Sequence, residues 1–210
     1  MNYIRAALSF VILFTLTGCM IKGVKNTNAY ATLPSNGTYA LILDSGDDIT
    51  APRIEKMLDY QMRNLGLSPA QNVTEADVHV RWAFDVVPMG STSTAFTSIQ
   101  PGRATANIVG NTAYIRSRPG TATTFTSTSD NYQKTIAVKM IGRSGQKLWE
   151  GRVTEVGWCN QIFVTSPHIL SLLFDKFPVE AINVTEEVND NPQSDKFKKL
   201  FPENTNWGCR

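Results

Sequence analysis

The feature that most constrains the fold is an alternation of apolar and polar side chains over residues 76–87. A period of two over this length predicts a β-strand with one buried face and one mixed face. Pro88 is expected to end the strand. The apolar members, at every second position, are Ala76, Val78, Val80, Trp82, Phe84 and Val86. One apolar face needs a cover, which other segments of the chain must supply.

Two amphipathic segments can supply that cover. The first predicts a helix capped near Thr50 and Pro52 and ending before Gly66. Its apolar positions at helical spacing are Ile54, Met57, Leu58, Met62 and Leu65. The second is expected to begin near Ser166-Pro167. Its apolar positions are Ile169, Leu172, Leu173 and Phe177.

Three further segments predict strands. Residues 38–44 form a short apolar run, and residues 132–141 and 147–156 form a hairpin around a glycine-containing loop. The order of strands and helices predicts an α+β fold. Specifically, we expect a two-layer sandwich in which a largely antiparallel sheet is covered by two helices.

The N-terminus has the features of an export signal. Arg5 precedes an apolar run over residues 6–16 that is too short to span a bilayer. The next residues complete Leu16-Thr17-Gly18-Cys19, which resembles the bacterial lipobox. Residues 1–18 are therefore expected to be a lipoprotein signal peptide, with a lipid on Cys19 as the membrane anchor. Met20 rather than aspartate follows, which by resemblance to enteric lipoproteins favours the outer membrane, with the domain facing the periplasm.

The mature chain is expected to have three parts. Residues 19–36 are polar and predict a tether, residues 37–182 the α+β domain, and residues 183–210 a polar tail. With Cys19 carrying the lipid, Cys159 and Cys209 remain as a pair in an oxidising compartment. A disulfide between them would hold the tail on the domain and contribute roughly 4 kcal/mol. Two unpaired thiols are the alternative, and the spacing does not match a zinc site.

The most unusual composition lies in residues 91–129, which predict a long Thr-rich hairpin or loop insertion. Ser and Thr occupy 16 of these 39 positions, and the absence of acidic residues suits anionic lipid headgroups or glycans. The apolar and aromatic residues of the segment could pair with a partner's edge strand. Long unusual loops often bind partners, although a solvated loop with no partner is the alternative. The candidate binding residues are Phe96, Arg103, Tyr114, Arg116, Arg118 and Phe125.

Several short motifs occur in a recognisable order. They are Arg63-Asn64-Leu65-Gly66-Leu67, Glu75-Ala76-Asp77-Val78-His79-Val80, Tyr132 with Val138, Gly145-Gln146-Lys147-Leu148-Trp149-Glu150-Gly151, and Leu172-Leu173 with Phe177-Pro178. In this order they resemble a Gram-negative lipoprotein family, domain of unknown function 4136, over residues 38–178. The resemblance implies an α+β lipoprotein without an established activity, and it supplies no catalytic residue.

The sequence lacks a recognisable catalytic or metal-binding pattern, so we expect neither an enzyme nor a bound cofactor or metal. Cleavage after Gly18 removes Arg5 as the only charged residue and lowers the formal charge from +2 to +1, which argues against a nucleic-acid binder. The leading hypothesis is a non-enzymatic lipoprotein that binds envelope protein partners, such as an accessory subunit of a secretion or surface assembly. The alternative is a small-ligand or lipid-binding module with an apolar cavity near Trp82, Phe84 and Trp149.

Overall fold

The computed structural model describes residues 21–47, 49–109, 112–188 and 199–200. The described residues are mostly β. The elements in chain order are β1 (Ile21–Ala29), β2 (Thr38–Ser45), α1 (Ala51–Asn64), β3 (Ser68–Pro69), the 3-10 turn η1 (Val73–Glu75), β4 (Val78–Gln100), β5 (Arg103–Val109), β6 (Thr112–Arg118), β7 (Thr121–Gly142), β8 (Lys147–Gly157), α2 (Ile162–Phe174) and β9 (Ala181–Val188). None of the described helices is long and apolar enough to cross a membrane.

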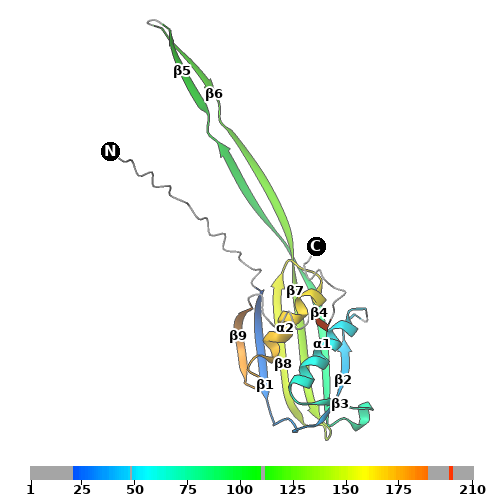
Figure 1. Cartoon of the computed structure of the whole chain (residues 1–210). Helices are drawn as coiled ribbons and strands as arrows, with labels where there is room; N and C mark the ends of the chain where they lie inside the picture. The colour runs from blue at the N-terminus through cyan, green and yellow to red at the C-terminus, as the bar shows by residue number, and fades with distance from the viewer. Residues whose placement is uncertain (1–20, 48, 110–111, 189–198, 201–210) are drawn as a thin grey trace, which may run out of the picture.

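Seven strands form one mixed sheet in the order β3-β2-β4-β7-β8-β1-β9 (Figure 1). The predicted α+β sandwich with a largely antiparallel sheet is therefore wrong. Strand β2 runs parallel to both β3 and β4, because the chain crosses over through α1 and returns to the same end of the sheet. The other neighbours in the sheet are antiparallel. Strands also occupy segments that were expected to be a tether and a tail.

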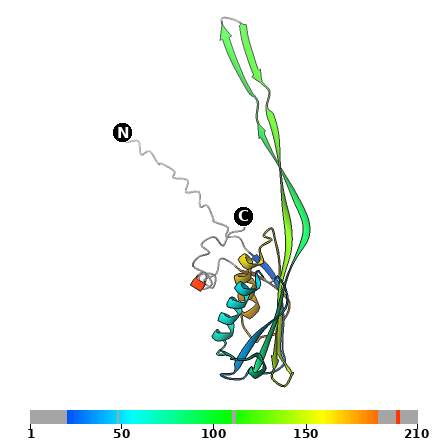
Figure 2. The ribbon, with the colours of Figure 1, turned by 90° about the vertical axis from the view of Figure 1, so that its right-hand side faces the viewer.

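The two helices pack on one face of the sheet (Figure 2). Helix α1 lies against β2 and β3, and α2 lies against β7, β8 and β1. The predicted apolar stripe of α1 is confirmed, because its four central side chains are fully buried. These are Ile54, Met57, Leu58 and Met62. Burying each such side chain contributes on the order of 2 kcal/mol.

Helix α2 begins at Ile162, four residues before the predicted start, and Pro167 lies inside it. A proline cannot donate to the carbonyl four residues earlier, here that of Phe163. The Ser166 hydroxyl donates to the Phe163 oxygen instead, at 3.0 Å. The helix therefore continues through a proline that the sequence pattern had placed at its start.

Strand β1 lies where a polar tether was expected, and that expectation is wrong for Ile21–Ala29. The residues that β1 buries are Gly23, Lys25 and Thr27, so no apolar alternation marks the strand in the sequence. Lys25 Nζ donates to the Asp175 carbonyl at 2.5 Å, and Thr27 Oγ1 donates to the Val179 carbonyl at 2.9 Å. Main-chain carbonyls in the segment that follows α2 thus allow a polar strand to be buried.

Strand β9 lies in the segment that was expected to begin a polar tail, and it pairs antiparallel with β1. Its partner β1 has no apolar alternation, and the apolar residues Ile182 and Val184 of β9 are exposed, so no buried apolar face marks either strand. Cys159 is disulfide-bonded. Cys209 and Cys19 lie outside the described residues, so the pairing of Cys159 with Cys209 and the lipidation of Cys19 stay predictions.

Candidate functional site

The candidate site is a two-stranded arm that projects from one end of the sheet (Figure 1). The arm comprises residues 90–131. Its shaft consists of residues 90–100 of β4 and 121–131 of β7, and its tip is the hairpin of β5 and β6. The expected hairpin over residues 91–129 is therefore present. It is a direct continuation of β4 and β7, which lie in the interior of the sheet.

A β-bulge marks the foot of the arm. Pro88 pairs with Tyr132 and Gly90 with Asn131, so Met89 is an extra residue on β4. Gly90 has a φ of +98°, which favours glycine. The prediction that Pro88 ends the strand is wrong. Pairing with β2 stops at Ala83, so β4 is an edge strand on that side when it reaches the proline, and an edge tolerates proline.

The shaft is held by a ladder of small hydroxylated side chains. Ser93 Oγ and Thr128 Oγ1 lie 3.1 Å apart, as do Thr97 Oγ1 and Thr124 Oγ1. At the foot, Asn131 Nδ2 donates to Thr92 Oγ1 at 2.7 Å. The two hydroxyl pairs lie directly opposite each other across the strands, whereas the Asn131–Thr92 contact is diagonal, because the direct partner of Asn131 is Gly90. Such cross-strand contacts reinforce the register of the ribbon.

Two aromatic side chains interrupt the polar surface of the shaft. Phe96 and Phe125 are direct cross-strand partners, and they are 63% and 60% exposed. Because opposite residues project to the same side of a ribbon, the two rings form one small apolar patch. Ile99 lies on the other side and is also exposed.

A paired Pro-Gly joint separates the shaft from the tip. Pro101-Gly102 stands opposite Pro119-Gly120, between the Gln100–Thr121 pair and the Arg103–Arg118 pair. The backbones approach closely here. A Cβ on Gly102 would lie 2.5 Å from the Arg118 oxygen, and one on Gly120 would lie 2.6 Å from the Gln100 oxygen. Only glycine fits either position without moving the opposite strand.

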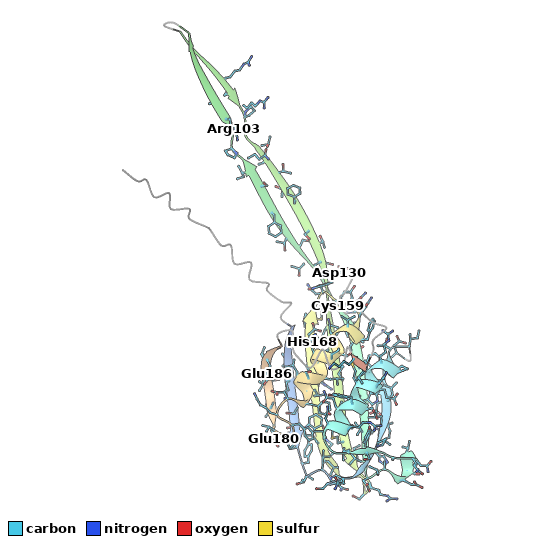
Figure 3. The ribbon with its side chains drawn as sticks, viewed as in Figure 1. Arg103, Asp130, Cys159, His168, Glu180 and Glu186 are labelled. Carbon is cyan, nitrogen blue, oxygen red and sulfur yellow. The ribbon has the colours of Figure 1, made fainter. Side chains whose placement is uncertain are left out.

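The tip carries the arginines of the arm. Arg103 pairs with Arg118, and Arg116 lies opposite Thr105, one pleat further along. The three arginines therefore project from one side of the tip hairpin, and all three are exposed. No acidic residue occurs in residues 91–129, so no acid of the arm's own sequence in that range can neutralise them. In Figure 3, Arg103 lies far out on the arm and Asp130 at its foot.

The predicted binding residues thus fall into two groups. Phe96 and Phe125 lie on the shaft, and Arg103, Arg116 and Arg118 lie on the tip. Seven residues of extended chain, roughly 23 Å, separate Phe96 from Arg103. Tyr114 is in β6 opposite Asn107 in the backbone register.

A buried ion pair lies below the foot of the arm and was missed in the sequence. Lys134 Nζ lies 2.8 Å from Glu155 Oε2 and donates to the Cys159 carbonyl at 2.8 Å. The two side chains are 0% and 4% exposed. The signal was available, because Lys134 continues the buried alternation of Ile136 and Val138 by one step.

The aromatic side chains around which a cavity was expected are packed against other rings. Trp82 stacks on Phe84 with ring centroids 5.9 Å apart, and Trp149 stacks on Phe174 at 5.6 Å. Phe84 also lines a cleft of about 670 Å³ near the foot of the arm. Polar groups around the cleft include Asp47, Asp85 and Gln161.

The described residues bring together no group of three or more His, Cys, Asp or Glu side chains that could hold a metal ion. The Nε2 atom of His79 lies 2.9 Å from the carbonyl oxygen of Val73, and this contact ties β4 to the turn η1. This contact gives His79 a structural role.

No protein-family model and no curated protein matches this chain. Among solved structures, the chain is similar to a PDZ domain protein from Parabacteroides distasonis, with 11% identity and a TM-score of 0.43, over 80% of this chain and 38% of that one. It is also similar to the PelC dodecamer from Paraburkholderia phytofirmans, with 11% identity and a TM-score of 0.43, over 76% of this chain and 99% of that one. A variant of that dodecamer gives a TM-score of 0.41. Likenesses at this level carry no argument about function.

Proposed function

We propose that this chain is a non-enzymatic lipoprotein, anchored in the outer membrane through Cys19 and facing the periplasm, whose arm binds an anionic component of the envelope. The observation that carries the proposal is the side of the tip with Arg103, Arg116 and Arg118. Three exposed guanidinium groups on one side of a ribbon suit phosphate or carboxylate groups, to which arginine donates pairs of hydrogen bonds.

The course of the chain near Cys19 supports an anchor at the same end as the arm. Strand β1 begins at Ile21, two residues after Cys19. Its third residue, Gly23, pairs with Glu155, and Gly157 at the end of β8 pairs with Tyr132 at the foot of the arm. A lipid on Cys19 would thus hold the foot of the arm close to the membrane surface.

The experiment measures binding of the unlipidated mature chain to envelope fractions and to vesicles with anionic or neutral lipids. A variant in which Arg103, Arg116 and Arg118 are all replaced by glutamine should lose about a hundredfold in affinity for anionic vesicles. This corresponds to roughly 1 kcal/mol per cation at such a surface. Binding by the wild type should weaken as salt is added.

The matched control removes three exposed cations from the body instead, as Lys139→Gln, Arg143→Gln and Arg152→Gln. This variant has the same net charge and should bind as the wild type does. Equal losses in both variants would mean that net charge rather than the tip determines binding. Unchanged binding in the tip variant would overturn the proposal.

The cleft beside Phe84 favours a second candidate function, the binding of a small ligand. Its volume of about 670 Å³ is in the range of small-molecule sites, and Phe163 adds a second ring to its lining. Native mass spectrometry of protein purified without denaturant should then reveal a bound small molecule. A mass equal to that of the polypeptide alone would exclude this candidate.

A further inference from the structure

The shaft of the arm has two long strand edges with no partner strand. Pairing of β4 with β2 stops at Ala83, and pairing of β7 with β8 stops at Tyr132. Beyond these residues, the described chain places no strand against the outer edge of either shaft strand. About half of the main-chain N–H and C=O groups on each strand then point outward.

The edges of the body are protected, whereas those of the shaft are not. Strand β3, at one edge of the sheet, has only two residues and includes Pro69. Strand β9, at the other edge, carries Glu186 and Glu187. Short edge strands, prolines and charges are the common means of preventing pairing with another chain. Residues 91–100 and 121–129 contain no charged residue and no proline.

An isolated two-stranded ribbon is also marginally stable in water. The shaft consists largely of Ser and Thr. Its small apolar patch is formed by Phe96 and Phe125, and both rings are exposed to solvent. Its cross-strand hydroxyl contacts are exposed, so each contributes little net stability. A neighbouring strand on each side would satisfy the outward main-chain groups and stabilise the ribbon.

We propose that the arms of neighbouring copies of this chain pair edge to edge, with the β7 edge of one copy against the β4 edge of the next. Two copies in the same orientation bring these edges together antiparallel, which repeats the β4–β7 pairing already present within the chain. The two edges have equal length, and the one charged residue on them, Asp130 at the foot of the β7 edge, meets no like charge in residues 90–100 of β4.

This contact joins two different edges, so each copy keeps one edge free for the next. An interface of this kind closes into a ring or extends into a row, depending on the rotation between copies. The pairing depends on the arm alone and not on the anchor. If Cys19 also carries a lipid, as the proposed function states, all copies would share one orientation at the membrane, which favours this pairing.

The arginines give the assembly a specific response to salt. Neighbouring arms would bring their arginine groups to about two strand spacings, roughly 10 Å, which is close to the Debye length at physiological ionic strength. Added salt screens this repulsion, so it should strengthen association of the copies. Binding of an anionic partner at the tip has the opposite dependence, which separates the two proposals.

The first measurement is sedimentation velocity of the mature chain with Cys19→Ser, at several salt concentrations. Oligomers that grow with salt are expected, whereas a variant with residues 90–131 replaced by a short turn should be monomeric. The variant with three tip arginines replaced by glutamine should associate at lower salt than the wild type. A wild type that stays monomeric at all salt concentrations would overturn the proposal.

The second measurement identifies the edges. Ser98→Cys on β4 is mixed with either Thr123→Cys or Ser127→Cys on β7, all in the Cys19→Ser background, and oxidised. The residues Ser98 and Thr123 share one side of the ribbon, as cross-strand partners do. A disulfide-linked dimer is expected in a β4–β7 mixture. None is expected with a single variant or with Thr74→Cys, an exposed control in η1.

Two results would contradict this arrangement. Dimers formed by one variant alone would mean that identical edges or faces meet, rather than β7 against β4. Cross-linking of the Ser98→Cys variant exclusively to a different polypeptide in intact cells would mean that the edge binds another protein. Either result leaves the vesicle experiment on the tip unaffected, so failure of this proposal and failure of the proposed function remain distinguishable.

Discussion

At the scale of single residues, the body of the sheet depends on charged side chains in places where apolar ones are usual. Lys134 and Glu155 face each other across β7 and β8, on the side of the sheet that also buries Ile136 and Val153. Isolated buried charges are costly, and this pair is tolerated because the lysine also bonds to the Cys159 carbonyl.

Breaking this pair should be much more damaging than replacing both members. We expect Lys134→Met to destabilise the domain by about 3–5 kcal/mol, because Glu155 would remain buried without its partner. The double variant Lys134→Met with Glu155→Leu should recover most of that loss. Urea unfolding at pH 7 measures both free energies.

The matched control is Lys147→Met, which breaks the exposed ion pair with Glu150, whose N–O distance is 3.2 Å. Its two side chains are 53% and 24% exposed, so we expect a much smaller loss than for Lys134→Met. A double variant as unstable as Lys134→Met alone would show that the pair does more than neutralise charge.

Asp77 gives the stability of the fold a dependence on acid pH. The Thr38 main-chain N–H and the Thr38 hydroxyl donate to Asp77 Oδ2 at 2.8 and 2.9 Å, and they hold the pKa of Asp77 below its ordinary value. The folded state therefore binds this proton less readily than the unfolded state, and stability increases with pH between the two pKa values.

The contribution of Asp77 should be fully present above the ordinary carboxyl pKa of about 4 and should disappear as the pH falls through the lowered one. We expect Asp77→Asn to have a smaller loss of urea midpoint between pH 7 and pH 2.5 than the wild type. Asp59 should keep part of the pH dependence in the variant. Burial raises the pKa of Asp59, but hydrogen bonds from Arg63 and Tyr39 lower it by more, so it lies below the ordinary value. Identical pH profiles would contradict this assignment.

At the scale of elements, the sequence predicts those segments whose burial is apolar and periodic. The alternation of β4 up to Val86, the α1 stripe and the β7–β8 hairpin are all confirmed. Strands β1 and β9 were missed because β1 buries Gly23, Lys25 and Thr27. Local pattern cannot reveal such a strand, since its burial depends on carbonyl groups about 150 residues away in the chain.

The arm shows what a pattern can and cannot predict about a site. The composition of residues 91–129 was sufficient to indicate a hairpin and its candidate residues. The sequence did not indicate that the bulge at Met89 shifts the alternation by one residue, so that even-numbered side chains of β4 change sides there. The division of the candidate residues between shaft and tip depends on the paired joint, which is visible only once Pro101-Gly102 and Pro119-Gly120 are aligned.

The joint itself gives a prediction about the arm. In the double variant Gly102→Ala and Gly120→Ala, each new methyl group would meet main-chain atoms of the opposite strand, so the strands must separate there. Amide hydrogen exchange of residues 103–118 should then become faster, with exchange of the body unchanged. Ser117→Ala is the control, because it adds no atom to the contact. Unchanged exchange in the double variant would mean that the close approach does not hold the tip.

At the scale of the whole molecule, the start of β1 and the arm are on the same end of the sheet. Strand β1 begins two residues after Cys19, so little chain remains to act as a tether. If Cys19 carries a lipid, as proposed, the foot of the arm should therefore be held close to the membrane rather than at the end of a flexible linker.

Replacing Cys19 with serine should release the protein from the membrane fraction without changing its fold. The reason is that Cys19 precedes the first residue of the sheet, so no described strand depends on it. Cell fractionation gives the location, and urea unfolding gives the stability, which should match that of the mature wild type. Undiminished membrane association of this variant would contradict the lipid anchor.

The continuity of β4 and β7 from the sheet into the arm has a mechanical consequence. Tension applied to the tip is transmitted along both strands into the middle of the body. There, β4 is bonded to β2 over residues 78–83, and β7 is bonded to β8 over residues 132–141. The hydrogen bonds of the antiparallel β7–β8 pair lie nearly perpendicular to the strands, and those of the parallel β4–β2 pair run slanted between them. A pull along the strands therefore loads many of these bonds in shear at once. The body is thus suited to resist force delivered through the arm.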